Sequence, residues 1–178
     1  MKGIYKSAEG ERLVRERYLA FLDHWPVAHR RHRMPTSQGE TFVVAFGVAG
    51  APALVLLHGG AANSAMWMDE ICAFAEHFRV FAIDMIGEPG LSAPSRPRLD
   101  SDAHAVSLDE ALRGLAVERA SMVGVSRADG WRWITRRGGR SGWSEWRCCA
   151  REEWDGRRRA SCLRLLCGCA AHRGGASY

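Results

Sequence analysis

The sequence has 178 residues, 47% of them hydrophobic and 25% charged, and a formal net charge of +5. This length suits one globular domain with a buried core. Lys2 and Lys6 are not followed by an apolar run and no window could span a bilayer, so we expect neither a signal peptide nor a membrane span.

The chain begins with the pattern of an amphipathic helix followed by two strands. Residues 8–24 are predicted to form a helix that Pro26 closes. Its apolar residues recur at helical spacing: Leu13, Tyr18, Phe21 and Leu22. Two strands are expected near 27–34 and 40–48, with Gln38-Gly39 as the turn between them.

The next segments alternate between apolar strands and helices. Ala53 to Leu57 predicts a central strand that is covered on both faces. Residues 66–77 are expected to form a helix that turns four side chains toward the core: Met66, Ile71, Phe74 and Phe78. A buried strand over 79–84 and a helix over 101–117 are expected to follow. One face of that helix carries Leu108, Leu112 and Leu115. This alternation favours right-handed βαβ units and a parallel sheet.

A serine follows the last apolar strand of this region. Met122 to Val125 is a short apolar run, and Ser126 comes directly after it. With Gly124 before it, Ser126 has the layout of a nucleophile elbow, G-x-S-x-G, in which a strained strand-to-helix turn presents the serine hydroxyl. Ala128 stands where that motif has its second glycine. An ordinary N-cap or turn serine is the alternative.

Six segments together resemble the α/β-hydrolase family, and within it the small bacterial carboxylesterase-like members. They follow the family's order and spacing from about Tyr18 to Ser126: H-W-P-V (24–27), M-P-T (34–36), L-V-L-L-H-G-G (54–60), S-A-M-W (64–67), R-V-F-A-I-D-M-I-G-E-P-G-L-S (79–92) and V-G-V-S (123–126). The resemblance implies that residues 1–128 form the N-terminal half of an α/β-hydrolase fold, a mostly parallel sheet with flanking helices.

The resemblance also implies roles for residues at the carboxyl ends of the strands. Ser126 would attack an ester carbonyl, and the backbone amides of Gly60 and Arg127 would form the oxyanion hole. The alternative for the His58-Gly59-Gly60 segment is a plain strand-to-helix turn. His58 would be structural, and Asp84 would hold the shape of a D-x-x-G-x-x-G-x-S loop.

Such chemistry implies a small-molecule ester as substrate and needs no metal or organic cofactor. We expect no nucleic-acid or membrane partner, and Cys72, the one cysteine of residues 1–128, suits a reducing cytoplasm. In the family the histidine and the acid of the triad follow the nucleophile. Only His172 lies downstream of Ser126 here. We therefore expect a serine hydrolase by descent whose 178-residue chain lacks the triad acid and histidine and is inactive.

The composition changes after residue 128. Residues 129–178 hold 11 arginines against 5 acidic residues, with five of the six cysteines and five of the seven tryptophans. This segment has one isoleucine and neither valine nor phenylalanine, so it is poor in strand formers. We predict an irregular or disordered tail over 129–178, attached to a partial α/β-hydrolase domain over 1–128.

A frameshift explains the change in composition. When codons are read one base out of phase from Arg127, Trp133-Ile134 forces Asp, Cys148-Cys149 forces Leu and Trp154-Asp155 forces Gly. With degenerate bases chosen to suit the family, the shifted reading is G-G-W-M-A-L-D-Y-A-T-R-R-P-E-R-V-E-R-V-A-L-L-C-P-G-G-V-G-R. Our hypothesis is that residues 127–178 are translated out of frame, after the loss of one base behind the Ser126 codon.

A rival interpretation makes the tail part of a non-catalytic binding module. Six residues could hold zinc: Cys148, Cys149, Cys162, Cys167, Cys169 and His172. No C-x-x-C pair occurs among them, which disfavours a metal site. The arginines interleaved with Trp131, Trp133 and Trp143 could bind nucleic acid by charge and stacking. Out-of-frame reading of GC-rich DNA produces the same composition, so we predict neither partner.

Overall fold

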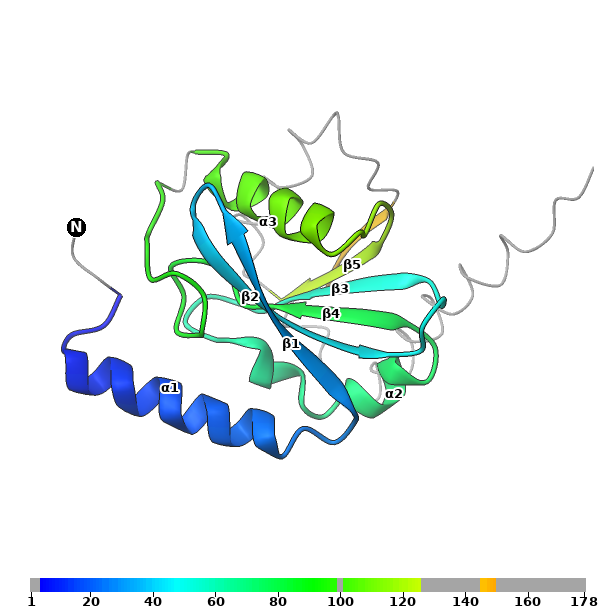
Figure 1. Ribbon diagram of the computed structural model, residues 1–178, viewed down its shortest axis with the longest axis horizontal. Helices are drawn as coiled ribbons and strands as arrows, with labels where there is room; N and C mark the ends of the chain where they lie inside the picture. Colours follow the sequence, from blue (N-terminus) through cyan, green and yellow to red (C-terminus); the bar gives the residue numbers. More distant parts are fainter. Residues whose placement is uncertain (1–3, 99–100, 126–144, 150–178) are drawn as a thin grey trace, which may run out of the picture.

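The computed structural model describes residues 4–98, 101–125 and 145–149 (Figure 1). Its elements, in chain order, are α1 (Ala8–Asp23), β1 (His29–Thr36), β2 (Gly39–Gly47), β3 (Ala53–Leu57), the 3-10 helix η1 (Ser64–Trp67), α2 (Ile71–Ala75), β4 (Arg79–Ile83), α3 (Ala103–Gly114), β5 (Ser121–Val125) and β6 (Glu145–Cys149). None of the helices in these ranges is both long and apolar enough to cross a membrane.

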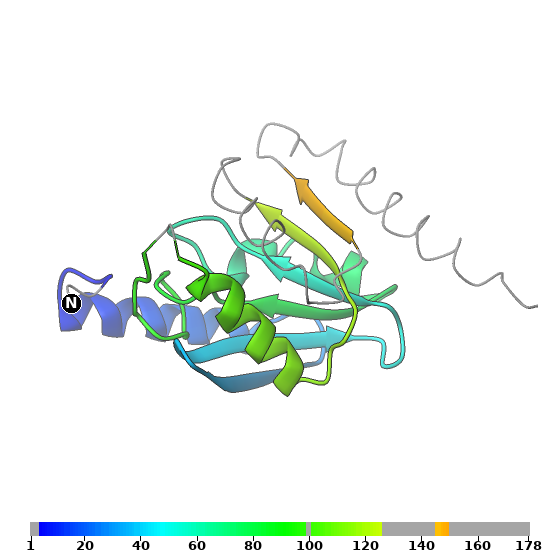
Figure 2. The same ribbon diagram turned by 90° about the horizontal axis from the view of Figure 1, so that it is seen from above.

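The strands form one mixed sheet in the order β1-β2-β4-β3-β5-β6. β2 runs antiparallel to both of its neighbours, whereas β4, β3, β5 and β6 pair in parallel. Figure 2 shows β1 and β6 at opposite edges of the sheet. This arrangement confirms the predicted α/β-hydrolase class for the part of the chain that carries the motifs, and it brings the carboxyl ends of β3, β4 and β5 together at one end of the sheet.

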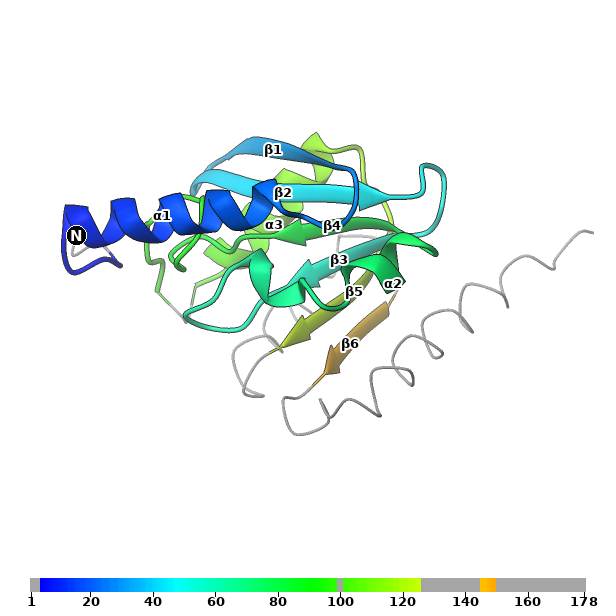
Figure 3. The ribbon, with the colours of Figure 1, turned by 90° about the horizontal axis from the view of Figure 1, so that it is seen from below.

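Helices cover both faces of the sheet, so the central strands are buried on both sides. Leu54 to Leu57 of β3 are fully buried, as the continuous apolar run predicts. α1 and α2 pack on one face, over a cluster that contains Leu22, Phe74 and Leu56. α3 packs on the other face (Figure 3). Its Leu108 and Leu112 belong to a second cluster, together with Val55 and Phe81.

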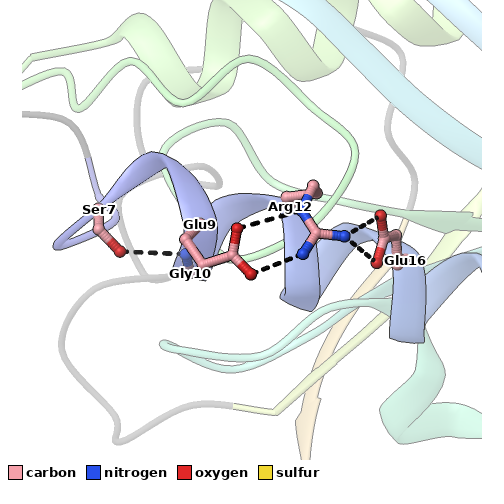
Figure 4. A network of polar contacts seen from close by, with 5 residues as sticks. All are labelled: Ser7, Glu9, Gly10, Arg12 and Glu16. Atoms are coloured by element: carbon pink, nitrogen blue, oxygen red, sulfur yellow. Dashed lines mark hydrogen bonds and ion pairs between the residues drawn. The ribbon is translucent and has the colours of Figure 1, made fainter.

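The helix α1 begins where a serine caps it. The Ser7 hydroxyl accepts a hydrogen bond from the Gly10 N–H at 3.0 Å, and Arg12 then bridges Glu9 and Glu16 along the exposed face (Figure 4). Tyr18 and Leu22 are buried as predicted. Two other members of the predicted apolar face are not buried, since Leu13 is 44% exposed and Phe21 is 56% exposed. Only a narrow stripe of this surface helix touches the core.

The single helix predicted over 66–77 is wrong. Two short pieces, η1 and α2, occupy this region, and the break between them leaves Met66 39% exposed. The first turn starts early because the Asn63 side chain accepts the Ala65 N–H at 3.0 Å. The helix resumes at Ile71 and then buries Ile71, Phe74 and Phe78 as predicted.

Within the segment that is predicted to be irregular or disordered, residues 145–149 form the short strand β6. β6 pairs in parallel with β5, from Ser121 opposite Glu145 to Val125 opposite Cys149, and β5 is therefore not the exposed edge that a disordered tail would leave. A ladder uses main-chain groups, which any non-proline residue supplies. The remainder of 129–178 lies outside the described residues, and so do the side chains of the zinc and nucleic-acid alternatives.

Candidate active site

Three segments converge where parallel strands end. β3 leads into His58-Gly59-Gly60, β4 leads into Asp84, and β5 leads into Ser126. Ligands of open α/β sheets bind at this end of the strands. Ser126 and Arg127 lie outside the described residues, so the description of the site rests on Gly60 and on Val125, the last described residue before the serine.

The glycine loop after β3 lies directly against the end of β5. A Cβ atom on Gly59 would lie 2.9 Å from the Val125 carbonyl oxygen, so only glycine permits this approach. Among the described residues, nothing lies within 4 Å of the equivalent position on Gly60 and no acceptor takes the Gly60 N–H. With respect to these residues, the Gly60 amide is free and lies beside open space next to the residue that precedes Ser126.

His58 is a structural residue, and both of its ring nitrogens are bonded. The ring is fully buried, and its Nε2 accepts the Met85 N–H at 2.9 Å. Nδ1 therefore carries the proton and donates to the Gly59 carbonyl oxygen at 2.8 Å. That carbonyl and the Gly60 N–H belong to one planar trans peptide, so they point in opposite directions. By holding the Gly59 oxygen, His58 directs the Gly60 N–H away from itself.

Asp84 joins three parts of the chain through its buried carboxylate. Oδ1 accepts from the Tyr18 hydroxyl at 2.9 Å, the Ser64 N–H at 2.9 Å and the Ser64 hydroxyl at 2.8 Å. Oδ2 accepts from the Leu91 N–H at 2.9 Å. Burial, with Asp84 nearby, raises the pKa of Tyr18, so this phenol stays protonated as a donor. Asp84 is thus a structural hub, in agreement with the role that the family resemblance implies.

The other members of the D-x-x-G-x-x-G-x-S segment serve the same hub. Gly87 has a φ of +75°, and a Cβ on Gly90 would lie 2.5 Å from Asp84 Oδ2. Both positions therefore require glycine. The Ser92 hydroxyl donates to the Asp84 carbonyl at 2.6 Å and accepts the Phe42 N–H at 2.8 Å, which ties the loop to β2.

Two further contacts join the glycine loop to the loop after β4, and no sequence pattern indicates them. The Asn63 side-chain amide donates to the Pro89 carbonyl at 2.9 Å. The Ala61 N–H donates to Glu88 Oε2 at 2.7 Å. These partners are 26 and 27 residues apart in sequence. The sequence offers one weak signal for them, which is a polar residue directly beside a motif glycine, as Glu88 is beside Gly87.

His104, at the start of α3, is another polar side chain near this end of the sheet. Its Nδ1 is buried and has no hydrogen-bond partner. Burial lowers the pKa of His104, and the negative charge of Glu88 opposes that shift. Within the described ranges no group of three His, Cys, Asp or Glu side chains could hold a metal ion.

Comparison with known proteins identifies the same architecture. Residues 52–127 match the model of the alpha/beta hydrolase fold family. The chain is 35% identical over 105 residues to carboxylesterase YbfK of Bacillus subtilis. The crystal structure of that carboxylesterase superposes with a TM-score of 0.61 at 33% identity over 67% of this chain. The naproxen esterase of Bacillus subtilis superposes with a TM-score of 0.60 at 31% identity over 68% of this chain.

The chain spans about a third of its curated relative's length, because the YbfK alignment covers 59% of this chain and 36% of the relative. The two superpositions cover 42% of each crystal structure.

Replacing the hub carboxylate should destabilise the fold. In Asp84→Asn the new NH₂ group must face an N–H or O–H donor, so we expect a loss of about 2–3 kcal/mol in the free energy of unfolding, measured by urea denaturation. Asp109→Asn is the matched control. It removes only the partly exposed pair between Asp109 and Arg113, worth about 0.5 kcal/mol. Equal losses in both variants would contradict the assignment of Asp84 as a hub.

Stability should decrease as the pH falls from about 7.5 to 5.5. The pKa of His104 is lower in the folded chain than its ordinary value of 6.5, so the unfolded chain binds more protons in this window. We expect His104→Gln to flatten the decrease, measured by urea denaturation at several pH values. His77→Gln, at an exposed histidine, is the control and should keep the wild-type slope. A wild-type slope in His104→Gln would contradict this prediction.

Proposed function

We propose that the chain is a carboxylesterase-like serine hydrolase by descent, with Ser126 as its nucleophile, because residues 52–127 match the alpha/beta hydrolase fold family. The observation that carries this proposal is the packing of Gly59 against the Val125 carbonyl. It brings the glycine loop beside the residue before Ser126, where a nucleophile and an oxyanion donor must meet. Both Bacillus subtilis relatives described above are named as esterases, which supports acyl transfer.

The reaction would be hydrolysis of a small-molecule ester in the cytoplasm. Ser126 Oγ attacks the carbonyl carbon, and the electron pair of the C=O bond moves to oxygen. The N–H groups of Gly60 and Arg127 stabilise this oxyanion. The alcohol then leaves, and water releases the acid from the acyl-serine. A serine at this position favours ester hydrolysis over the dehalogenase and epoxide hydrolase reactions of the same fold.

We propose that the polypeptide of residues 1–178 is inactive, because six of its seven histidines precede Ser126 in the sequence, whereas the family's catalytic histidine follows the nucleophile. His58 uses both ring nitrogens in structural hydrogen bonds. His104 is carried by α3, which packs over β1 and β2, whereas β5 lies on the other side of the sheet's centre. Without a base only the residual acceleration from the oxyanion hole and substrate binding would remain.

The proposed change of reading frame after Ser126 accounts for the missing histidine and acid. Two observations support it. The matched family segment ends at residue 127. β6 is a strand beside β5 whose sequence, E-W-R-C-C, places Glu145 and Arg147 in the parallel part of the sheet. Such strands are normally continuous apolar runs. With degenerate bases chosen to suit the family, the shifted reading of these codons is V-A-L-L-C, an apolar run.

A serine-directed fluorophosphonate probe tests the activity. We expect the purified 178-residue protein to label far more slowly than an intact serine esterase at pH 7, because no base activates Ser126. Mass spectrometry of the labelled peptide and Ser126→Ala, as the control, identify the site. Rapid labelling that Ser126→Ala abolishes would show that the chain is active and contradict the proposed inactivity.

Sequencing the coding DNA around Ser126 tests the reading frame. We expect codons 127–155 to spell the G-G-W-M-A-L-D peptide and its continuation when they are read one base out of phase. Inserting one base after the Ser126 codon should then produce a protein that the probe labels rapidly at Ser126. Codons that cannot encode this peptide in the shifted phase would eliminate the hypothesis.

A further inference from the structure

The oxyanion donor Gly60 is held in place by the residues around it. Glycine is the most flexible residue, and no described residue lies within 4 Å of the Cβ position of Gly60 to restrict it. Its amide can stabilise an oxyanion only if it is already oriented before the reaction. The structure therefore has to fix the two peptide planes that flank Gly60.

The peptide before Gly60 is fixed by His58, whose Nδ1–H donates to the Gly59 carbonyl oxygen. The peptide after Gly60 is fixed from the other side of the site. Its N–H belongs to Ala61 and donates to Glu88 Oε2 at 2.7 Å, the length of a charge-assisted hydrogen bond. Rotation about φ and ψ of Gly60 is therefore restricted, because a side chain holds each of the two peptide planes that flank it.

The backbone of Ala61 is strained, and the hydrogen bond from its N–H to Glu88 holds it in that conformation. Ala61 has a φ of +57°, in the left-handed region that disfavours residues with a Cβ. The other described residue of this kind, Ala116, follows the end of α3 and donates to the Arg113 carbonyl, as expected at a helix C-terminus. Ala61 follows no helix, and its N–H is held by the Glu88 carboxylate instead. Such a conformation persists only where its surroundings impose it.

We propose that Glu88 is a positioning residue for the oxyanion hole: its carboxylate holds the Ala61 N–H and, together with His58, immobilises the Gly60 amide. This inference rests on the proposed function for its catalytic meaning and on the structure for the constraint itself. Glu88 acts through the Gly60–Ala61 peptide, from a half-buried position on the loop that Asp84 organises.

The test compares Glu88→Ala with a matched control in the ¹⁵N-labelled 178-residue protein. Glu110→Ala removes the same kind of contact elsewhere, since Glu110 Oε2 accepts the Ser37 N–H at 2.7 Å. In Glu88→Ala we expect the Ala61 amide to exchange with solvent about tenfold faster. The order parameter of Gly60 should fall from about 0.85 toward 0.6. Glu88→Gln keeps a carbonyl acceptor and should retain most of the order.

A double variant separates positioning from general stability. Glycine adopts the left-handed conformation without strain, so Ala61→Gly should restore the stability that Glu88→Ala loses. It should not restore the order of Gly60, because the second peptide plane still lacks its anchor. Unchanged order at Gly60 in Glu88→Ala, or an equal loss in Glu110→Ala, would overturn the proposal.

The fluorophosphonate probe distinguishes this proposal from the proposed function. If the probe labels Ser126 at a measurable rate, Glu88→Ala should slow that labelling at least tenfold and Glu110→Ala should not. Labelling that Glu88→Ala leaves unchanged would overturn the catalytic part. Labelling that Ser126→Ala does not abolish would refute Ser126 as the nucleophile, while the order of Gly60 still decides whether Glu88 fixes the loop.

Discussion

The buried carboxylate of Asp84 is the interaction on which the site depends. It accepts four hydrogen bonds, and these come from α1, from the start of η1 and from the loop after β4. A carboxylate in the interior is costly unless donors surround it, so the three segments that supply the donors are held in one arrangement. The loop after β4 then carries Glu88 and Pro89 to the glycine loop, where they meet Ala61 and Asn63.

This arrangement explains why acidic and glycine residues alternate in the loop after β4. Gly90 leaves room for the Asp84 carboxylate, and Gly87 makes a turn that closes against Ser95. Glu88 stands between these glycines and reaches the glycine loop after β3. On its inner side the loop after β4 hydrogen-bonds to Asp84, and on its outer side it supports the glycine loop after β3. One short segment links the packing of the sheet to the geometry of the site.

Sequence patterns predicted the elements that depend on local chemistry. The apolar run of β3 has the predicted bounds, and β4, β5 and α3 lie within a few residues of theirs, because burial on both faces leaves a strong apolar signal. The prediction of one helix over 66–77 was wrong because a separate turn, η1, begins at Ser64, where Asn63 and the distant Asp84 bind its first residues. The roles of Tyr18 and Glu88 were missed for the same reason, since their partners come from other parts of the chain.

Composition predicts an irregular or disordered tail, and it gives no indication of the short strand β6 within it. Composition describes side chains, whereas β5 presents main-chain groups that accept any strand able to reach them. β6 satisfies that edge although its sequence is unlike a central parallel strand. The part of the site before Ser126 differs from β6, because specific side chains hold it together. Its hydrogen bonds join residues 18–92, so the part that we propose as the oxyanion hole forms from the segment upstream of Ser126. The nucleophile half depends on residues after β5. At β6 the backbone pairs with β5, but the sequence E-W-R-C-C lacks the continuous apolar pattern that parallel strands normally have.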